Sequence, residues 1–308
     1  MTRGAKLIRL FAALAGLTVF LVAAFSIILP WIPTWGATEE ETARTLPGDE
    51  LLSDPAVMMT HGIGIEVPPE SVWPWIAQIG DVRGAFYSYT FIENLIAGER
   101  MYVNADRIIP QLQNPRVGDQ LIEGGMLNVY ALEEGSWLLG SADPEFPLGW
   151  TWIWAVFPEG PDRTRLISRF RIQPPGELDG NALVGFIMTT GSFVMARKMM
   201  QGIKDRGEGR IEAPYVQPLE IAVWLLALAT GIFAAVSYVR RRRWWQPLVV
   251  GIASVLALLC FTFGQPVVWL RVLVDLILIG GLYWVWRRKP RAAVALSEKL
   301  EDRLEHHE

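Results

Sequence analysis

The chain has 308 residues, of which 51% are hydrophobic, with a mean hydropathy of +0.26 and a formal net charge of −4. This composition excludes an ordinary soluble domain, and the excess of apolar residues lies in four blocks. The small acidic charge argues against nucleic acid as a partner, because the basic clusters lie beside apolar blocks. A single cysteine, Cys260, excludes an intrachain disulfide, and the three histidines have no spacing that suits zinc, so we expect no metal and no cofactor.

The first apolar block, residues 10–29, is long enough to cross a bilayer as a helix. Basic residues within 1–9 precede the block and three glutamates at 39–41 follow it, so the positive-inside rule predicts a cytoplasmic N-terminus. A cleavable signal peptide is the alternative. We favour a retained anchor, because the apolar region is long for a signal peptide and residues 32–37 lack a small-residue cleavage pattern. Residues 30–54 are expected to form a polar linker.

Three further apolar blocks, 221–239, 247–263 and 267–286, predict three more membrane-spanning helices. Basic runs at 240–243 and 287–291 mark cytoplasmic ends, so the C-terminal tail, 287–308, is also expected in the cytoplasm. The predicted protein is therefore a multi-pass cell-membrane protein whose globular domain lies outside the cytoplasm. Arg271 and Asp275 lie four residues apart in the last block. We expect them to pair with each other or to face other helices, rather than to form an ion site.

Residues 55–210 have the character of a separate α+β domain. An alternating strand at 57–67 precedes a helix that starts at Pro68, and a second short helix covers 90–96. Short strands divided by turns then occupy 120–172, and a long helix covers 181–204. Runs of strands with segregated helices predict a curved antiparallel sheet, two short helices, and a long C-terminal helix laid across the sheet.

Aromatic and polar residues alternate in the stretch 81–110, which suits the lining of a cleft for a partly apolar ligand. The structural alternative is a hinge whose amides and charges cap helices and close loops. Three tryptophans share one face of the strand 150–157, and the long helix is rich in methionine, which adapts to irregular partners. The candidate ligand-binding residues are Trp75, Arg83, Tyr87, Tyr89, Asn94, Asp106, Arg107, Trp150, Trp152, Trp154, Phe186 and Phe193.

The strand 164–172 carries Arg165, Arg169 and Arg171 on one face. If this face is the outer one, the arginines are solvated surface residues, which is the interpretation we favour. If it is the concave one, they could hold a carboxylate or phosphate head group.

Several motifs in this domain resemble one known superfamily. They are the P-P-E-x-V-W helix start at Pro68, the R-G-x-F-Y-S-Y segment at Arg83 and the N-A-D-R segment at Asn104. The region from about 55 to 204 resembles the START/Bet v-like superfamily, also called SRPBCC, and specifically a membrane-tethered bacterial branch. The resemblance implies a helix-grip fold with a deep apolar cavity between the sheet and the last helix. It does not determine function, since members include lipid carriers, receptors and cyclases.

Together these features predict membrane-tethered binding of a hydrophobic small molecule or lipid, as a carrier or sensor, with no catalytic residues. One alternative is a cyclase- or isomerase-like enzyme in which His61, Tyr87 and Asp106 are the plausible acid/base groups. Another is a non-catalytic assembly protein whose domain contacts a partner protein and whose spans form a homo-oligomer. We favour binding, because the sequence contains no catalytic signature.

Overall fold

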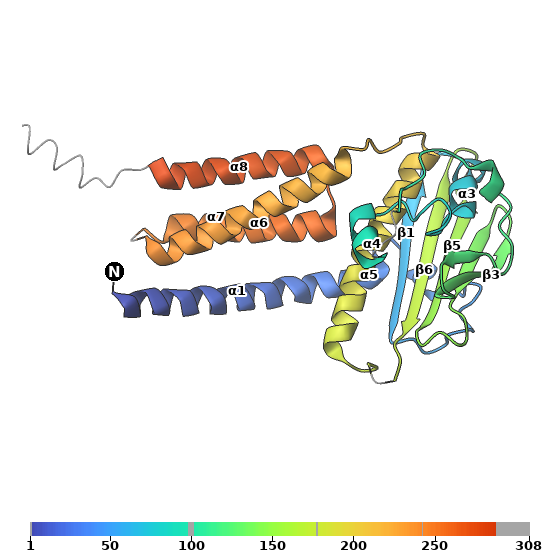
Figure 1. The fold of residues 1–308 in the computed structure, drawn as a ribbon, viewed down its shortest axis with the longest axis horizontal. Helices are drawn as coiled ribbons and strands as arrows, with labels where there is room; N and C mark the ends of the chain where they lie inside the picture. Colours follow the sequence, from blue (N-terminus) through green and yellow to red (C-terminus); the bar gives the residue numbers. More distant parts are fainter. Residues whose placement is uncertain (1, 98–101, 177, 242, 288–308) are drawn as a thin grey trace, which may run out of the picture. The chain divides into compact units, whose positions relative to one another are not determined.

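The computed structural model describes residues 2–97, 102–176, 178–241 and 243–287 (Figure 1). The chain forms two compact units. One comprises Met1–Leu21 and Pro214–Glu308, and the other is Val22–Ala213. The predicted cytoplasmic tail lies outside the described residues, except for Arg287, which ends the last helix.

The unit Val22–Ala213 contains one six-stranded antiparallel sheet, in the order β1-β6-β5-β4-β3-β2. The hairpin expected between the strands near Trp150 and Thr164 is confirmed, because β5 and β6 pair along their whole length. Alternating β-branched and aromatic residues favour these strands, and Gly-containing turns separate β2 from β3, β3 from β4 and β5 from β6. The strands are β1 Val57–Ile65, β2 Gln120–Ile122, β3 Leu127–Glu133, β4 Trp137–Ser141, β5 Gly149–Pro158 and β6 Thr164–Gln173.

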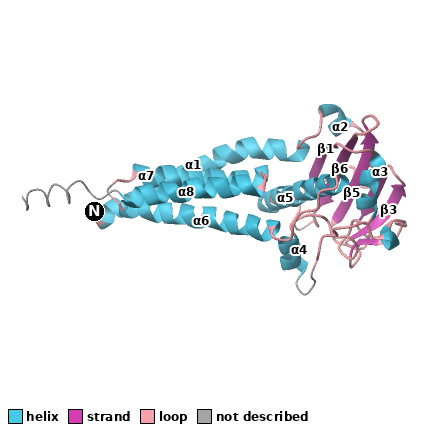
Figure 2. Ribbon diagram, turned by 90° about the horizontal axis from the view of Figure 1, so that it is seen from above, coloured by secondary structure: helices cyan, strands magenta, loops and turns pink. Residues whose placement is uncertain are grey.

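Three helices of this unit follow the predicted pattern: α3 Pro69–Ala77, α4 Thr90–Ala97 and α5 Ala182–Gly207. Asn181 caps α5 by accepting hydrogen bonds from the backbone N–H groups of the next turn. The long helix α5 lies across one face of the sheet (Figures 1 and 2). We call this the inner face. The predicted α+β helix-grip architecture is therefore confirmed.

Strand register identifies the residues of the inner face. Trp154 pairs with Ser168, which pairs with His61, and directly paired residues point to the same side of a sheet. His61 packs edge-on against Phe193 of α5, with ring centroids 5.5 Å apart. The tryptophans of β5 therefore face α5, and the neighbouring Arg169 faces away from it.

The segment expected to be a linker begins beside α5, where Trp31 and Trp35 pack on Phe193. From Thr38 onward it packs on the outer face of the sheet. It contains a 3₁₀ turn, η1 Ile32–Thr34, and a short helix, α2 Glu39–Ala43. The helix begins with a capping box between Thr38 and Glu41. Leu46 then packs with Leu139, Ile153 and Ile167. The outer face is therefore covered by protein.

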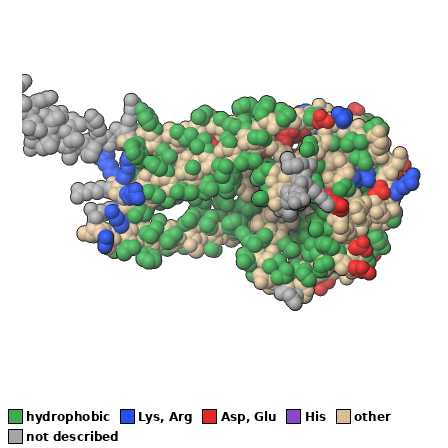
Figure 3. All heavy atoms as spheres, in the orientation of Figure 1, with side chains coloured by type: hydrophobic (Ala, Val, Ile, Leu, Met, Phe, Trp, Pro, Cys, Tyr) green, Lys and Arg blue, Asp and Glu red, His purple; other side chains and the backbone are tan. Residues whose placement is uncertain are grey.

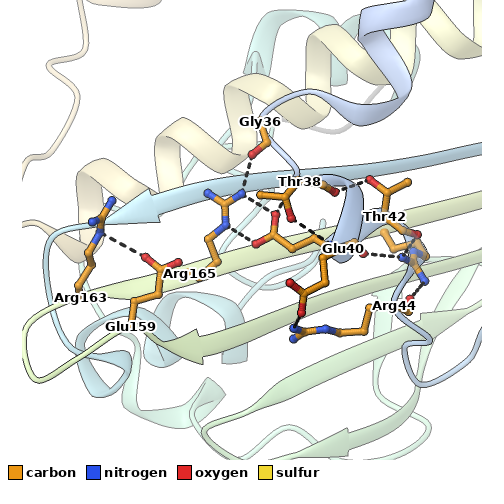
Figure 4. A network of polar contacts seen from close by, with 10 residues as sticks. Gly36, Thr38, Glu40, Thr42, Arg44, Glu159, Arg163 and Arg165 are labelled. Carbon is orange, nitrogen blue, oxygen red and sulfur yellow. Dashed lines mark hydrogen bonds and ion pairs between the residues drawn. The ribbon is translucent and has the colours of Figure 1, made fainter.

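The three arginines of β6 hold this segment in place, so our expectation of solvated arginines was wrong. Arg165 pairs with Glu41 at 2.7 Å and donates to the Gly36 carbonyl (Figure 4). Arg169 pairs with Asp49 at 2.6 Å and is only 3% exposed. Arg171 also contacts Asp49, at 3.1 Å. Since the arginines point away from α5, they are not available to hold a head group on the inner face.

Among the residues that the structure describes, four helices are long and apolar enough to cross a membrane. They are α1 Arg3–Trp31, α6 Val216–Arg240, α7 Trp245–Leu259 extended by the π-turn η3 Cys260–Gly264, and α8 Val268–Arg287. Hydrophobic side chains cover these helices, and basic side chains gather at one end of them, on the left in Figure 3. The arrangement is compatible with a multi-pass membrane protein.

The charged residues of α8 do not pair with each other. Arg271 instead pairs with Glu220 of α6 at 2.9 Å and donates to the Pro266 carbonyl at 2.8 Å. Asp275 is buried, and neither of its carboxylate oxygens has a hydrogen-bond partner among the described residues. The expectation that these charges face other helices is therefore met for Arg271.

Candidate ligand-binding site

The inner face of the sheet carries a continuous aromatic surface. Trp150 stacks on Trp152 with ring centroids 5.8 Å apart, and Trp152 lies 4.6 Å from Trp154. Phe86, from the loop before α4, stacks almost parallel on Trp152 at 6.0 Å. Phe170 of β6 meets Trp150 and Trp152 edge-on. Such a surface offers a large apolar contact area to a flat or elongated ligand.

Two hydrogen-bond donors on this surface are unused. The indole N–H of Trp152 donates to the Ser168 hydroxyl at 2.7 Å. The indole N–H groups of Trp150 and Trp154 are buried and have no partner among the described residues. Because an unpaired buried donor costs roughly 1–3 kcal/mol, a ligand oxygen that reached them would relieve this cost.

Helix α4 contributes a carboxyl group that is also buried without a hydrogen-bond partner among the described residues. Both carboxylate oxygens of Glu93 are buried without a partner among the described residues. Burial raises the pKa of Glu93 to about 7, because the charged form loses its hydration. Near neutral pH this side chain is therefore partly protonated and can donate a hydrogen bond.

His61 is held by the protein itself. Its Nε2 lies 2.9 Å from the Ile32 carbonyl oxygen, so this nitrogen carries the proton and donates to that oxygen. The ring packs edge-on against Trp35 and Phe193. Burial lowers the pKa of His61 to about 4, so the imidazole is neutral at pH 7. These contacts match a core histidine better than a general base.

The other two acid/base candidates lie in different surroundings. The Tyr87 hydroxyl donates to the Trp75 carbonyl at 2.9 Å, and burial raises the pKa of Tyr87. The Arg206 guanidinium lies over the Tyr87 ring, 4.6 Å from its centroid. Asp106 is exposed. The structure therefore gives no support for His61, Tyr87 and Asp106 acting as one catalytic group.

Several predicted ligand-binding residues take part in closing the loops of 78–119. Arg83 pairs with Asp119 at 3.2 Å and donates to two backbone carbonyls. Asn94 exchanges hydrogen bonds with the backbone of Tyr102. Tyr89 lies under the ammonium group of Lys198. These contacts fit the structural alternative for the stretch 81–110, and a role in ligand contact remains a prediction.

The remaining predicted residues are dispersed. Trp75 packs on Tyr87, and Arg107 is exposed. Phe193 packs on His61, whereas Phe186 lies nearer the N-terminal end of α5, against Phe25. Of the predicted set, the structure brings together the three tryptophans of β5 and, separately, Trp75 with Tyr87.

Three relevant residues were absent from the predicted set: Phe86, Glu93 and Gln78. Phe86 was visible within the aromatic cluster of 86–91, but its stacking on β5 is a long-range contact. Gln78 joins two parts of the loop region. Its side-chain oxygen accepts a hydrogen bond from the Ile109 backbone N–H, and its side-chain amide donates one to the Arg107 carbonyl. No local sequence pattern identifies a residue that makes such long-range hydrogen bonds.

An open surface pocket of about 590 Å³ lies elsewhere, between the start of α3 and the β3–β4 and β5–β6 turns. Pro68, Trp73, Glu134 and Pro161 are among its lining residues. It includes none of the aromatic residues of the inner face. Within the described part of the chain, no group of three or more His, Cys, Asp and Glu side chains could hold a metal ion.

No protein-family model and no curated protein matches the sequence. Solved structures similar to this chain include a START superfamily protein from Mycobacterium smegmatis, with 13% identity over 49% of this chain and 97% of that one, at a TM-score of 0.30. Norcoclaurine synthase from Thalictrum flavum has 13% identity over 48% of this chain and 91% of that one, at 0.30. A protein from Mesorhizobium loti has 17% identity over 51% of this chain and 100% of that one, at a TM-score of 0.29.

The globular unit has a six-stranded antiparallel sheet with the long helix α5 across one face, which is a helix-grip arrangement. Each of the three similar structures covers about half of this chain. Identities this low say nothing about the ligand of this domain.

Proposed function

We propose that this protein binds a hydrophobic small molecule or lipid on the inner face of its START-like domain, next to the membrane. The observation that carries the proposal is the stack of Trp150, Trp152 and Trp154, in which two buried indole N–H groups lack partners among the described residues. An aromatic surface with unused donors suits an apolar molecule that carries an oxygen acceptor.

Burial of the ligand's apolar surface would supply the affinity, at roughly 25 cal/mol per Å² before the costs of binding. The free indole N–H groups would orient a carbonyl, hydroxyl or carboxyl oxygen. Phe86 now covers Trp152, so a ligand would replace the Phe86 ring on the stack. Binding therefore requires the loop before α4 to move.

We favour a carrier or sensor over an enzyme. The hydrogen bonds of His61 and Tyr87 go to backbone carbonyls, and Asp106 is exposed. A general acid or base must reach the substrate proton, whereas His61 Nε2 and the Tyr87 hydroxyl are already engaged with the carbonyls of Ile32 and Trp75.

We propose that the chain crosses the membrane four times, with both termini in the cytoplasm and the START-like domain outside it. The positive-inside rule supports this orientation. Arg9, near the start of α1, donates to the Arg241 carbonyl, just after α6, at 2.6 Å. This contact supports placing the basic N-terminus and the basic α6–α7 connection on the same side.

Native mass spectrometry of the full chain, purified in lipid nanodiscs and followed by extraction of bound molecules, tests the binding proposal. We expect a discrete apolar ligand in the wild type and its loss in Trp152→Ala. Trp137→Ala is the matched control, because Trp137 packs on the outer face. An empty wild-type protein, or equal retention of the ligand in Trp152→Ala, would contradict the proposal.

A further inference from the structure

The N-terminal half of α5 is an apolar surface that the sheet does not cover. Leu183 and Ile187 are 66% and 58% exposed, whereas Phe193, Met199 and Met200 further along the same helix are buried. No charged residue occurs between Asp179 and Arg197. Hydrophobic side chains cover the lower part of the domain in Figure 3, where this half of α5 lies in Figure 1. Large exposed apolar patches mark contact surfaces.

Contacts within the unit Val22–Ala213 place this surface beside the end of the first span. Phe186 meets Phe25 of α1 edge-on, with ring centroids 5.2 Å apart. Phe25 belongs to the apolar block 10–29, so a bilayer that contains this block also reaches Phe25. Ile27, on the opposite face of α1, is 76% exposed, as expected for a side chain in lipid.

Aromatic and cationic groups mark where the apolar region ends. The Arg197 guanidinium of α5 lies over the rings of Trp31 and Trp35, 5.4 and 4.7 Å from their centroids. Tryptophan and arginine favour the head-group level of a bilayer. Phe25 precedes Trp31 by six helical residues, or about 9 Å at 1.5 Å per residue, toward the hydrocarbon. Phe186, in contact with Phe25, reaches the same depth.

Helix α4 adds to this surface. Leu95 is 81% exposed, and Phe91 is also exposed. The start of α4 is joined to α5, because the Ser88 hydroxyl donates to the Met195 carbonyl at 2.8 Å. Two neighbouring helices of the domain therefore turn large apolar side chains outward.

We propose that the N-terminal half of α5, around Leu183, Phe186 and Ile187, inserts into the leaflet that holds the C-terminal end of α1, with α4 at its side. The occupant of this surface is the lipid bilayer itself. An inserted α5 would expose one edge of the inner face to lipid, so a ligand would reach the aromatic stack from the membrane and not from water. This access route rests on the proposed function, whereas the insertion does not.

Nitroxide labels on the full chain in phosphatidylcholine and phosphatidylglycerol vesicles test the insertion, with Cys260→Ser as the background. Leu183→Cys and Ile187→Cys carry the test labels. Ile27→Cys is the reference in lipid, and Tyr130→Cys, an exposed position on β3, is the aqueous reference. We expect a several-fold higher ratio of oxygen to nickel-chelate collisions at positions 183 and 187 than at 130, close to the ratio at 27.

Ratios at 183 and 187 that match position 130 would overturn the insertion. Labels shielded from both reagents, with spin–spin broadening, would also overturn it and indicate a second copy of the chain on this surface. Repeating the measurement in Trp152→Ala separates the two proposals. The labels at 183 and 187 should stay at the same depth in the bilayer when Trp152→Ala loses the ligand. A failure of ligand binding and a failure of insertion therefore give different results.

Discussion

At the scale of single residues, the buried carboxyl group of Glu93 makes the stability of the helix-grip domain depend on pH. Its pKa is raised by burial to about 7, from an ordinary value of 4.5. The native state therefore retains a proton that the unfolded chain releases between these values, and stability falls as the pH rises from 4.5 to 7. A shift of this size corresponds to about 3 kcal/mol at 1.36 kcal/mol per unit.

Glu93→Gln should therefore raise Tm at pH 8, where the native carboxylate is charged, and should change Tm little at pH 4. Thermal unfolding of the full chain in detergent at the two pH values measures this difference. Glu145→Gln, at an exposed position, is the matched control. Equal effects of Glu93→Gln at both pH values would show that the Glu93 carboxyl is not desolvated in the native state.

Gly36 is a second residue whose identity the structure explains. It has φ +68°, and an added Cβ would lie 2.2 Å from the Gly62 carbonyl oxygen of β1. Gly36→Ala should therefore destabilise the domain by about 2 kcal/mol or more, through strain and a backbone clash. Gly180→Ala is the control, because Gly180 has φ +72° with open space around it. Thermal unfolding should show a clearly larger loss for Gly36→Ala. Equal losses of stability in the two variants would mean that backbone strain alone, and not the clash with Gly62, accounts for the effect of Gly36→Ala.

At the scale of elements, one buried ion pair joins α6 to α8. Removing one member takes this ion-pair partner from the other buried charge, which costs about 3–5 kcal/mol in buried pairs. Glu220→Gln and Arg271→Met should each lower Tm strongly, and the double variant should lose less than the sum of the two. A double-mutant cycle by thermal unfolding measures this coupling. Additive losses would show that the pair at 2.9 Å contributes no interaction energy.

The strands and helices of the domain could be predicted because their signals are local. The alternation at 57–67 and the tryptophan periodicity of 150–157 depend on neighbours two residues apart, and both segments are strands. The cover on the outer face could not be predicted in this way. Arg169 donates to the Arg44 carbonyl, 125 residues away, and no pattern in the polar stretch 39–54 indicates that partner.

The candidate site was predictable only in part for the same reason. Periodicity predicts that Trp150, Trp152 and Trp154 share a face, but only the register with β6 and the position of α5 determine that this face is the inner one. Hydrogen bonds from Tyr87 and Arg83 to backbone carbonyls likewise depend on how the loops close. The aromatic content of the loops around 81–110 is compatible with both cleft lining and loop closure.

At the scale of the whole molecule, the proposed topology predicts which positions a membrane-impermeant reagent reaches. In a Cys260→Ser background, Tyr130→Cys in the helix-grip domain should react with an impermeant maleimide in intact cells. Trp244→Cys, at the α6–α7 connection, should react only after permeabilisation. Both side chains are exposed, so burial does not explain a difference between them. The reverse labelling pattern would place the domain in the cytoplasm.

The measurement that tests the central claim most directly is photo-crosslinking of the full chain in membranes with a diazirine-bearing lipid, followed by peptide mapping. The account predicts adducts on peptides of β5, around Trp150 and Trp152, and on α5, with the β5 adducts lost in Trp152→Ala and kept in Trp137→Ala. Adducts confined to α1, α6, α7 and α8 would contradict this claim, because the helix-grip domain would then not bind lipid on its inner face.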